Sequence, residues 1–339
     1  MVYPIEMDIE GMAEETRAIE GKKRALDRCR PLSSAVVKRL EADFNLEMTF
    51  NSNAIEGNTL TLHETDMVLR RGITIGNKTL REHFEARNHG KALVFLRSVI
   101  AKRQKFSKEL ILQLHHEIMR EIDTDAGLFR RTQVRILGTN HIPPNHLKVE
   151  KLIDQLVEWY YANENRVPAW LLAATVHFKI AHIHPFADGN GRTARLLMNL
   201  VLLQKGYPPA VILHVDRKKY YRVLREADAG RAKNFYTFVA RAVDRSLSIW
   251  LSALSTGKKS EKRGFIPLKE AAKQTEYSFE YLSLLARKGR LGAIKLRRNW
   301  VITQEALDEY LAQIAARTAR AKARRQKISR QTRAASASR

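Results

Sequence analysis

The sequence of 339 residues contains a single cysteine, at position 29. A lone thiol excludes an intramolecular disulfide framework and any zinc site built mainly from thiolates. Long apolar runs are also missing, because the most apolar stretch, residues 168–183, contains His177, Lys179 and His182. This excludes a conventional membrane-spanning helix, and the first 30 residues mix acids and bases without the apolar segment of a secretory signal. We therefore expect a cytoplasmic protein.

Acidic residues are scarce relative to basic ones, with 36 Asp and Glu against 60 Lys and Arg and a formal net charge of +24. The excess is uneven. Residues 257–311 contain twelve bases and seven acids, and residues 312–339 contain nine bases and no acid. These two segments carry +14 of the charge, and the first 256 residues carry +10. Strong positive charge predicts a polyanionic partner and says little about the fold.

Apolar residues at helical spacing dominate the chain up to residue 252 and predict a mainly α protein. The expected helices cover residues 107–119, 152–161, 168–183, 192–205, 217–229 and 235–252. The alternation around Val134 and Ile136, followed by His141 and Ile142, predicts a short β-hairpin. We divide the chain into an N-terminal helical region (1–100), a helical core (101–252), a linker (253–264), a small C-terminal domain (265–313) and a basic tail (314–339). The composition of the tail predicts disorder.

A glycine-rich segment lies between two of the predicted helices. Its sequence is HPFADGNGRTAR, residues 184–195. Pro185 ends the first helix after His184, and the glycines at positions 189 and 191 allow backbone N–H groups to form an anion-binding nest where the next helix begins. Arg192 and Arg195 are three residues apart and therefore share a helix face beyond this nest.

Two further side chains in this segment bring catalytic chemistry. Asp188 can supply the carboxylate that phosphate-bound Mg²⁺ usually takes from a protein. A histidine such as His184 titrates near neutral pH and can accept a proton from an attacking hydroxyl. Taken singly, a turn of this kind and a histidine at a helix end are more often structural. Together, the nest, the two guanidiniums, the carboxylate and the base predict phosphoryl or nucleotidyl transfer.

The segment resembles the signature of the Fic family, His-Pro-Phe-x-Asp/Glu-Gly-Asn-Gly-Arg-x-x-Arg, at every specified position. The resemblance extends over roughly residues 30–250. It implies a Fic-type helical bundle with a β-hairpin flap and the transfer of AMP from ATP to a Ser, Thr or Tyr hydroxyl of a protein. His184 would be the base, Asp188 would hold Mg²⁺ and Phe186 would anchor the loop. The resemblance assigns the ATP phosphates to five residues: Gly189, Asn190, Gly191, Arg192 and Arg195.

Two further features of the family bear on this chain. A phosphorylating branch of the family has Lys where this chain has Gly191, so the sequence resembles the AMP-transferring branch. The flap would include Thr132, Val134 and Ile136, and an exposed strand there could pair with an extended segment of the target. A plain surface hairpin explains the same alternation equally well.

An upstream motif, Ser52-Asn-Ala-Ile-Glu-Gly-Asn58, resembles the inhibitory signature of the family. By itself it describes the C-terminal end of a helix with Gly57 as its cap. The resemblance implies that Glu56 pairs with Arg195, and we expect a bidentate pair that withholds the guanidinium from the γ-phosphate. The position of the motif is typical of the class with an inhibitory helix N-terminal to the Fic domain.

The segment after the linker predicts a helix from residue 267, a second helix from Ser278 and two short strands between residues 291 and 302. This order resembles the winged helix-turn-helix of excisionase and MerR-type DNA-binding domains. The second helix would enter the major groove, and Arg297 and Arg298 would contact the DNA backbone or minor groove. A protein-contact module is the alternative.

Two functions remain open. One is a self-restrained protein adenylyltransferase that modifies a target protein or itself, with ATP as substrate and Mg²⁺ as cofactor. The other is a DNA-binding transcription regulator of toxin–antitoxin type whose Fic core is sensory or also removes AMP. The sequence leaves open the target, the donor nucleotide and the oligomeric state, and a homodimer is compatible with it.

Overall fold

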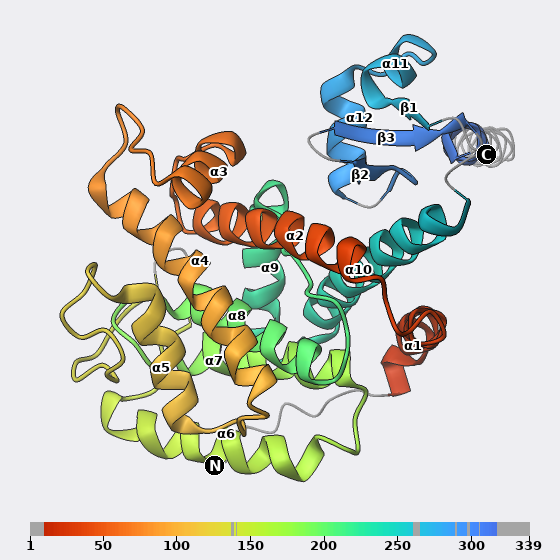
Figure 1. The fold of residues 1–339 in the computed structure, drawn as a ribbon. Helices are drawn as coiled ribbons and strands as arrows, with labels where there is room; N and C mark the ends of the chain where they lie inside the picture. The colour runs from red at the N-terminus through yellow and green to blue at the C-terminus, as the bar shows by residue number, and fades with distance from the viewer. Residues whose placement is uncertain are drawn as a thin grey trace, which may run out of the picture. The chain divides into compact units, whose positions relative to one another are not determined.

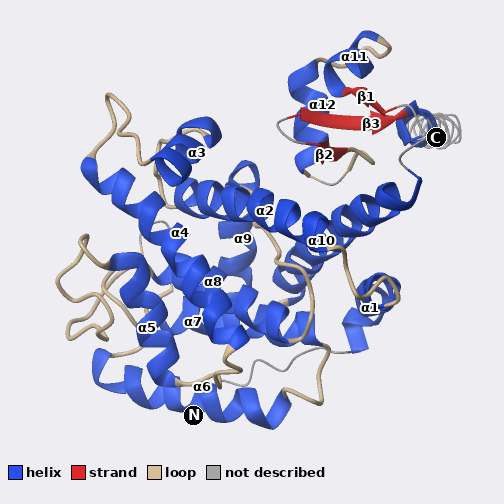
Figure 2. Ribbon diagram, in the orientation of Figure 1, coloured by secondary structure: helices blue, strands red, loops and turns tan. Residues whose placement is uncertain are grey.

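The computed structural model describes residues 10–136, 139, 141–259, 265–288, 290–296, 299–304 and 306–316. The chain divides into two compact units, residues 1–251 and 252–339. The described residues of the first unit form helices and loops, and those of the second form helices and a small sheet (Figures 1 and 2). No helix among these residues has both the length and the apolar character needed to cross a membrane.

The helices of the first unit follow one another along the chain, and the last of them runs beyond the unit boundary at residue 251. They are α1 (Ala13–Asp27), α2 (Ser34–Ile55), α3 (Leu62–Arg71), α4 (Leu80–Ala101), α5 (Lys108–Met119), α6 (Val149–Asn163), α7 (Ala169–Ile183), α8 (Asn190–Gln204), α9 (Arg217–Asp228) and α10 (Lys233–Lys259). Three single-turn 3₁₀ helices accompany them: η1 (Glu10–Met12), η2 (His146–Lys148) and η3 (His214–Asp216).

Helix α8 lies in the core of the first unit, because every residue from Arg192 to Leu202 is buried. It packs against α7, and α4, α5 and α2 also contact it. A helix that is buried on all sides is normally apolar, yet α8 contains two buried arginines near its first turn. Buried charges need counter-charges or strong hydrogen bonds, so the surroundings of these arginines define the candidate site.

The helices predicted from residue spacing are present, with ends that differ by a few residues. Ser107 caps α5 as expected, because its hydroxyl accepts from the Leu110 N–H (3.3 Å). The largest difference is at α10, which continues to Lys259 and so occupies part of the expected linker, residues 253–264. Ser255, Thr256 and Gly257 in this segment have weak helix propensity, but an existing helix can be extended at little cost because nucleation has already occurred.

The β-hairpin expected at Thr132–Ile142 is wrong for the described residues, since residues 131–136, 139 and 141–145 contain no strand. Side chains take the backbone acceptors that a ladder would need. The Gln133 amide donates to the Pro143 carbonyl (2.8 Å), and the Arg130 guanidinium donates to the carbonyls of Thr132 and Pro144. The described residues of this segment are therefore a loop whose two ends are joined by hydrogen bonds, and we call residues 130–136, 139 and 141–145 the flap loop.

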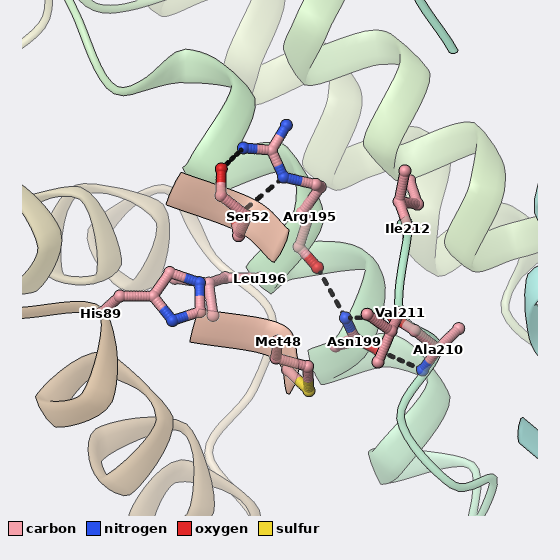
Figure 3. A pocket seen from close by; sticks show the side chains of 9 residues that line it. All are labelled: Met48, Ser52, His89, Arg195, Leu196, Asn199, Ala210, Val211 and Ile212. Atoms are coloured by element: carbon pink, nitrogen blue, oxygen red, sulfur yellow. Dashed lines mark hydrogen bonds between the residues drawn. The ribbon is translucent and has the colours of Figure 1, made fainter. Parts of the chain in front are cut away.

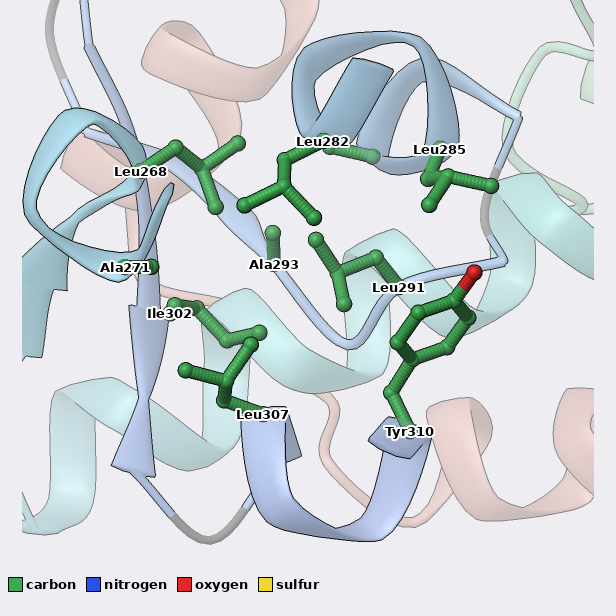
Figure 4. Close-up of a cluster of buried hydrophobic side chains, with 10 residues drawn as sticks. Leu268, Ala271, Leu282, Leu285, Leu291, Ala293, Ile302, Leu307 and Tyr310 are labelled. Carbon is green, nitrogen blue, oxygen red and sulfur yellow. The ribbon is translucent and has the colours of Figure 1, made fainter. Parts of the chain in front are cut away.

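The second unit is a small α/β structure around its own core. It contains β1 (Phe265–Pro267), α11 (Leu268–Lys273), α12 (Phe279–Arg287), β2 (Ile294–Leu296) and β3 (Asn299–Thr303), and residues 306–316 are helical. The three strands are antiparallel in the order β1-β3-β2. The buried side chains come from both helices, the sheet region and the last helix (Figure 4): Leu268, Ala271, Leu282, Leu285, Ala286, Leu291, Ala293, Ile302, Leu307 and Tyr310.

Three buried histidines make the stability of the first unit depend on pH. Burial lowers the pKa of His89 and His177 to about 3 and that of His115 to about 4. In the unfolded chain these imidazoles take up a proton near pH 6.5, so the unfolded state binds more protons below that pH. As the pH is lowered from about 6.5 to 4, we therefore expect the free energy of unfolding to fall. Each histidine should contribute up to about 1.4 kcal/mol per pH unit to this fall.

Urea unfolding at about pH 7 and about pH 5 measures this loss. The exposed His63 on α3 provides the control, because His63→Ala should leave the difference in free energy of unfolding between the two pH values unchanged. Equal stability at the two pH values would contradict the expectation.

Candidate active site

The loop between α7 and α8 brings residues 184–191 to the start of the buried helix α8. His184 follows α7 with left-handed backbone angles (φ 52°), and Gly189 precedes α8 with φ 76°. The Asn190 side chain closes the loop, because its amide donates to the Phe186 carbonyl (2.8 Å) and its oxygen accepts from the Phe186 N–H (2.9 Å). The expected nest thus has a rigid frame, in which Asn190 has only its backbone N–H left for a phosphate.

The His184 imidazole is set up as a proton acceptor. Its Nδ1 lies 3.2 Å from the Ala181 carbonyl. A proton on Nδ1 that donates to this carbonyl leaves Nε2 unprotonated. Burial is the main cause that lowers the pKa of His184 below 6.5, and the positive charge of Arg130 acts in the same direction. The ring is therefore neutral near pH 7, which is the form a general base needs.

Arg130 fixes the backbone around His184. It is 5% exposed, and its Nε donates to the His184 carbonyl (2.8 Å). The Arg130 N–H donates to the Pro185 carbonyl (2.9 Å), and its guanidinium also reaches the carbonyls of Thr132 and Pro144. One buried side chain thus connects both ends of the flap loop with the residue that carries the imidazole.

A second anchor lies under the glycines. Phe186 is fully buried, as expected, and stacks on His115 with ring centroids 3.6 Å apart. The Gly127 N–H donates to His115 Nδ1 (2.9 Å), so Nε2 carries the proton and donates to the Asp188 carbonyl (3.1 Å). A Cβ atom at position 189 would lie 2.9 Å from Met119 Sδ, so this close contact as well as its positive φ requires glycine.

Asp188 presents a half-exposed carboxylate beside the nest. Its Oδ1 accepts from the Gly189 N–H and lies 3.6 Å from the Arg192 guanidinium, and its Oδ2 accepts from Arg81. Burial by itself would raise the pKa of Asp188, but Arg192, the Gly189 N–H and Arg81 outweigh it and lower the pKa. A charged, half-exposed carboxylate is the hard oxygen donor that Mg²⁺ prefers, so this residue fits a phosphate-bound Mg²⁺.

Arg192 is only 2% exposed and faces acidic side chains. Its guanidinium nitrogens lie 3.3 Å from Glu85 Oε1 and 3.6 Å from Asp188 Oδ1, and one contacts Met119 Sδ (3.4 Å). The nitrogen near Glu85 is Nη1, and within the described residues neither Nη1 nor Nε makes a hydrogen bond. Such donors are costly unless an acceptor binds them.

Arg195 is also buried and takes its partners from α2. Its Nε donates to Ser52 Oγ (2.9 Å), and its Nη2 donates to the Ser52 carbonyl (2.8 Å) and to Glu56 Oε1 (2.7 Å) (Figure 3 for Ser52). The expected bidentate pair is therefore wrong, because only one guanidinium nitrogen contacts one carboxylate oxygen. Ser52 occupies the Nε atom that a second bond would use.

Glu56 sits where α2 ends. Gly57 follows it with φ 105° and donates to the Ala54 carbonyl, so the motif is also an ordinary glycine-capped helix end. The second carboxylate oxygen accepts from Tyr221 (3.3 Å). A Cβ atom at Gly191 would lie 2.3 Å from Glu56 Oε1. The carboxylate thus lies directly against the backbone of the expected phosphate nest.

A small cavity lies beside Arg195. Its volume of about 10 Å³ has room for about one water molecule, which is too little for a nucleotide. Its lining comes from α2, α4, α8 and the segment before η3 (Figure 3): Met48, Ser52, His89, Arg195, Leu196, Asn199, Ala210, Val211 and Ile212.

The other predicted site residues have different outcomes. In the flap loop, Thr132 is exposed, and Val134 and Ile136 are half-buried. Arg297 and Arg298 lie outside the described residues. A residue that is not among these predictions, Tyr220 of α9, packs in the core beside Arg195, and its hydroxyl lies 2.9 Å from His177 Nε2.

Four residues that hold the site do not stand out in the sequence: Arg81, Glu85, His115 and Arg130. Each lies more than fifty residues from the loop or on another helix, so no local spacing links them to it. One usable signal exists at His115, which shares the apolar helix face of Ile111 and Ile118 at i+4 and i+7. A polar side chain on a buried face needs a partner, and here the partner is the loop.

Arg81 competes with a metal ion for Asp188. Because Arg81 contacts the carboxylate directly, we expect Arg81→Ala to strengthen divalent-cation binding to the ATP complex by up to about fivefold, since a surface ion pair contributes up to about 1 kcal/mol. Titration with Mn²⁺, followed by electron paramagnetic resonance, measures the affinity of the ATP complex for the cation. Arg87→Ala is the matched control on α4, because Arg87 pairs with Glu121 instead. Unchanged or weaker Mn²⁺ binding in Arg81→Ala would contradict the competition.

Comparisons with known proteins identify relatives of this chain. A family model described as the Fic/DOC family matches residues 105–202. A protein adenylyltransferase Fic from Drosophila grimshawi is 34% identical over 225 residues, which is 66% of this chain and 46% of that protein. The chain spans about half the length of the curated relatives it matches.

Two solved structures extend the comparison beyond the family model. A fragment of Fic-1 from C. elegans is 30% identical with a TM-score of 0.66, and the match covers 72% of this chain and 74% of that chain. A Fic domain containing signalling protein from Bacteroides thetaiotaomicron is 27% identical with a TM-score of 0.66, and the match covers 73% of this chain and 100% of that chain.

Proposed function

This chain belongs to the Fic/DOC family, and from that premise we propose that it is a protein adenylyltransferase that transfers AMP from ATP to a Ser, Thr or Tyr hydroxyl of a protein. The single observation that supports this best is the neutral His184 with its Nε2 available, held by Arg130 beside a glycine nest. A protein that only bound or sensed ATP would not need a positioned base. Transfer of label from ATP to protein tests the proposal.

The proposed reaction uses the residues as follows. Nε2 of His184 takes the proton from the target hydroxyl, whose oxygen attacks the α-phosphorus of ATP. The bond between the α-phosphorus and the bridging oxygen breaks, and pyrophosphate leaves. Backbone N–H groups at residues 189–191 and the N-terminus of α8 hold the phosphates. Mg²⁺ held by Asp188, when bound, would neutralise charge on the phosphates.

The buried arginines support a triphosphate as the donor. The Nε and Nη1 atoms of Arg192 have no hydrogen-bond acceptor among the described residues, and phosphate oxygens would supply acceptors. Arg195 already has an anionic partner in Glu56. A β- or γ-phosphate that reaches Arg195 must therefore replace the carboxylate.

We propose on the same grounds that Glu56 restrains the enzyme. Its carboxylate holds Arg195 and lies against Gly191, so it blocks both the guanidinium and part of the nest. Ser52 supports this arrangement because it orients the guanidinium toward α2. The target can be a second protein or this chain itself, and the flap loop with Thr132, Val134 and Ile136 is the proposed docking segment for its extended backbone.

For the second unit we propose DNA binding through a winged helix-turn-helix. Helices α11 and α12 are joined by a short turn, Ser278 caps α12, and β2 and β3 are antiparallel neighbours, as in a wing. Residues 257–339 carry a net charge of +14, and nine of the bases lie after residue 316. Positive charge of this density binds phosphates without requiring a particular sequence.

Salt dependence tests the DNA proposal. We expect duplex DNA binding by the full chain to weaken steeply with salt. The logarithm of the binding constant should fall with the logarithm of the salt concentration, with a slope of roughly 0.9 for each phosphate neutralised. Deletion of residues 317–339 should lower this slope by several units while adenylylation persists. Fluorescence anisotropy with a labelled duplex at several salt concentrations measures it, and binding that does not respond to salt or is undetectable would favour a protein-contact role.

A further inference from the structure

Three metal-ligating side chains meet beside the flap loop. His141 comes from the loop itself, His182 from the last turn of α7 and Asp228 from the end of α9. One donor atom of each lies within 4.8 Å of the donor atoms of the other two. His182 Nδ1 lies 2.8 Å from Asp228 Oδ1, and the two imidazole centroids are 4.2 Å apart. The chain spacing of these residues gives no hint of the cluster.

We propose that His141, His182 and Asp228 bind a divalent transition-metal ion, with Zn²⁺ as the best fit. Two imidazoles and one carboxylate are the nitrogen and oxygen donors that Zn²⁺ prefers, whereas Mg²⁺ prefers a set made of oxygens. Metal–ligand bonds of about 2 Å place neighbouring donors about 3.3 Å apart in a tetrahedral site. The observed spacings need only small side-chain movements to meet this value.

The surroundings favour an ion over an isolated hydrogen bond. The side chains of His182 and Asp228 are only 15% and 16% exposed, so the carboxylate is held in a poorly solvated place. A divalent ion would balance the charge of this carboxylate and take the place of the hydrogen bond between His182 and Asp228.

The position of the site gives it a structural consequence. It connects the flap loop to α7 two residues before His184. His141 already reaches this helix end, because its Nε2 lies 2.9 Å from the His182 carbonyl. An ion here would hold the flap loop against the end of α7. The site shares no residue with those proposed for Mg²⁺ or ATP.

Isothermal titration of the full chain with ZnCl₂, after removal of metals with a chelator, tests the site. We expect one Zn²⁺ per chain, bound with an affinity at least about tenfold lower in Asp228→Asn and His141→Gln. His63→Ala, which removes an exposed histidine of α3, is the control and should not change the affinity. Asp228→Asn keeps an acceptor for His182 and so should fold. Excess Mg²⁺ should not displace the ion. Equal Zn²⁺ binding by the wild-type chain and Asp228→Asn would overturn the proposal, as would the absence of binding.

Limited proteolysis gives a readout that is independent of affinity and activity. Arg131 and Arg135 are exposed trypsin sites in the flap loop. Zn²⁺ should slow cleavage at both sites several-fold in the wild-type chain and leave the rate unchanged in Asp228→Asn. Equal protection of both proteins would assign the zinc to another place, and no protection of either would refute a clamp on the loop.

Discussion

Replacing Glu56 by glycine is expected to raise self-adenylylation by about ten- to a hundredfold. The variant removes the carboxylate from Arg195, and a hydrogen bond between charged groups contributes about 1.5–3 kcal/mol, which corresponds to this factor in the competition for a phosphate. It also clears the space beside Gly191, where Glu56 Oε1 now lies. Incubation with ATP labelled at the α-phosphate and Mg²⁺, followed by gel autoradiography, measures the product.

The stability of this variant provides a second measurement. Arg195 is 4% exposed, so loss of Glu56 leaves a buried guanidinium whose remaining hydrogen-bond partners among the described residues are Ser52 and Tyr220. Breaking such a pair destabilises a protein, although Glu56 is itself 29% exposed and solvent reduces the cost. The thermal midpoint without nucleotide should fall in Glu56→Gly, and ATP should raise it more than in the wild-type chain.

Two controls separate charge from backbone effects. Glu56→Gln keeps the size of the side chain and loses its charge, so it should activate less than glycine does. Glu121→Gly removes another carboxylate that pairs with an arginine, Arg87, and should not activate. Unchanged labelling in Glu56→Gly with normal ATP binding would refute the inhibitory role and leave the proposed transfer reaction to be tested by His184.

The contiguous part of the site could be predicted because its residues are neighbours in the chain. Residues 184–195 contain the proposed base, the proposed metal carboxylate, the nest and both arginines, and a helix that begins at Asn190 fixes their arrangement. The contact between Glu56 and Arg195 joins residues 139 positions apart, and only the family resemblance predicted it. The motif does not reveal that this pair has one hydrogen bond in place of two, because that depends on Ser52, whose hydroxyl accepts from Arg195 Nε.

The errors have a common physical cause. Alternating residues at Thr132–Ile136 favour a strand, but the pattern does not reveal that the Arg130 and Gln133 side chains use the nearby carbonyls. Likewise, Asp228 supplies the carboxylate beside His182 although 46 residues separate them. Tertiary contacts of this kind decide which local preference prevails, and a single sequence contains no direct record of them.

Replacing His184 is expected to abolish transfer while ATP still binds. General-base catalysis contributes about a hundred- to ten-thousandfold, and the phosphates contact groups other than this imidazole in the proposed site. The left-handed backbone at φ 52° disfavours alanine, so His184→Asn is the better variant, because asparagine tolerates this conformation. The backbone bonds to Ile180 and Arg130 remain available in either variant.

The experiment is made in the Glu56→Gly background, where the signal is large. Labelling should disappear in Glu56→Gly/His184→Asn and persist in Glu56→Gly/His63→Ala, with equal ATP affinity by titration calorimetry in all three proteins. Since burial lowers the pKa of His184 below 6.5, the active background should keep its rate as the pH falls from about 7 to 6.5 and lose it only below that. Persistent labelling in the His184 variant would show that another group takes the proton. Normal ATP binding with no labelling in any variant would instead favour a DNA-binding regulator whose Fic core is sensory.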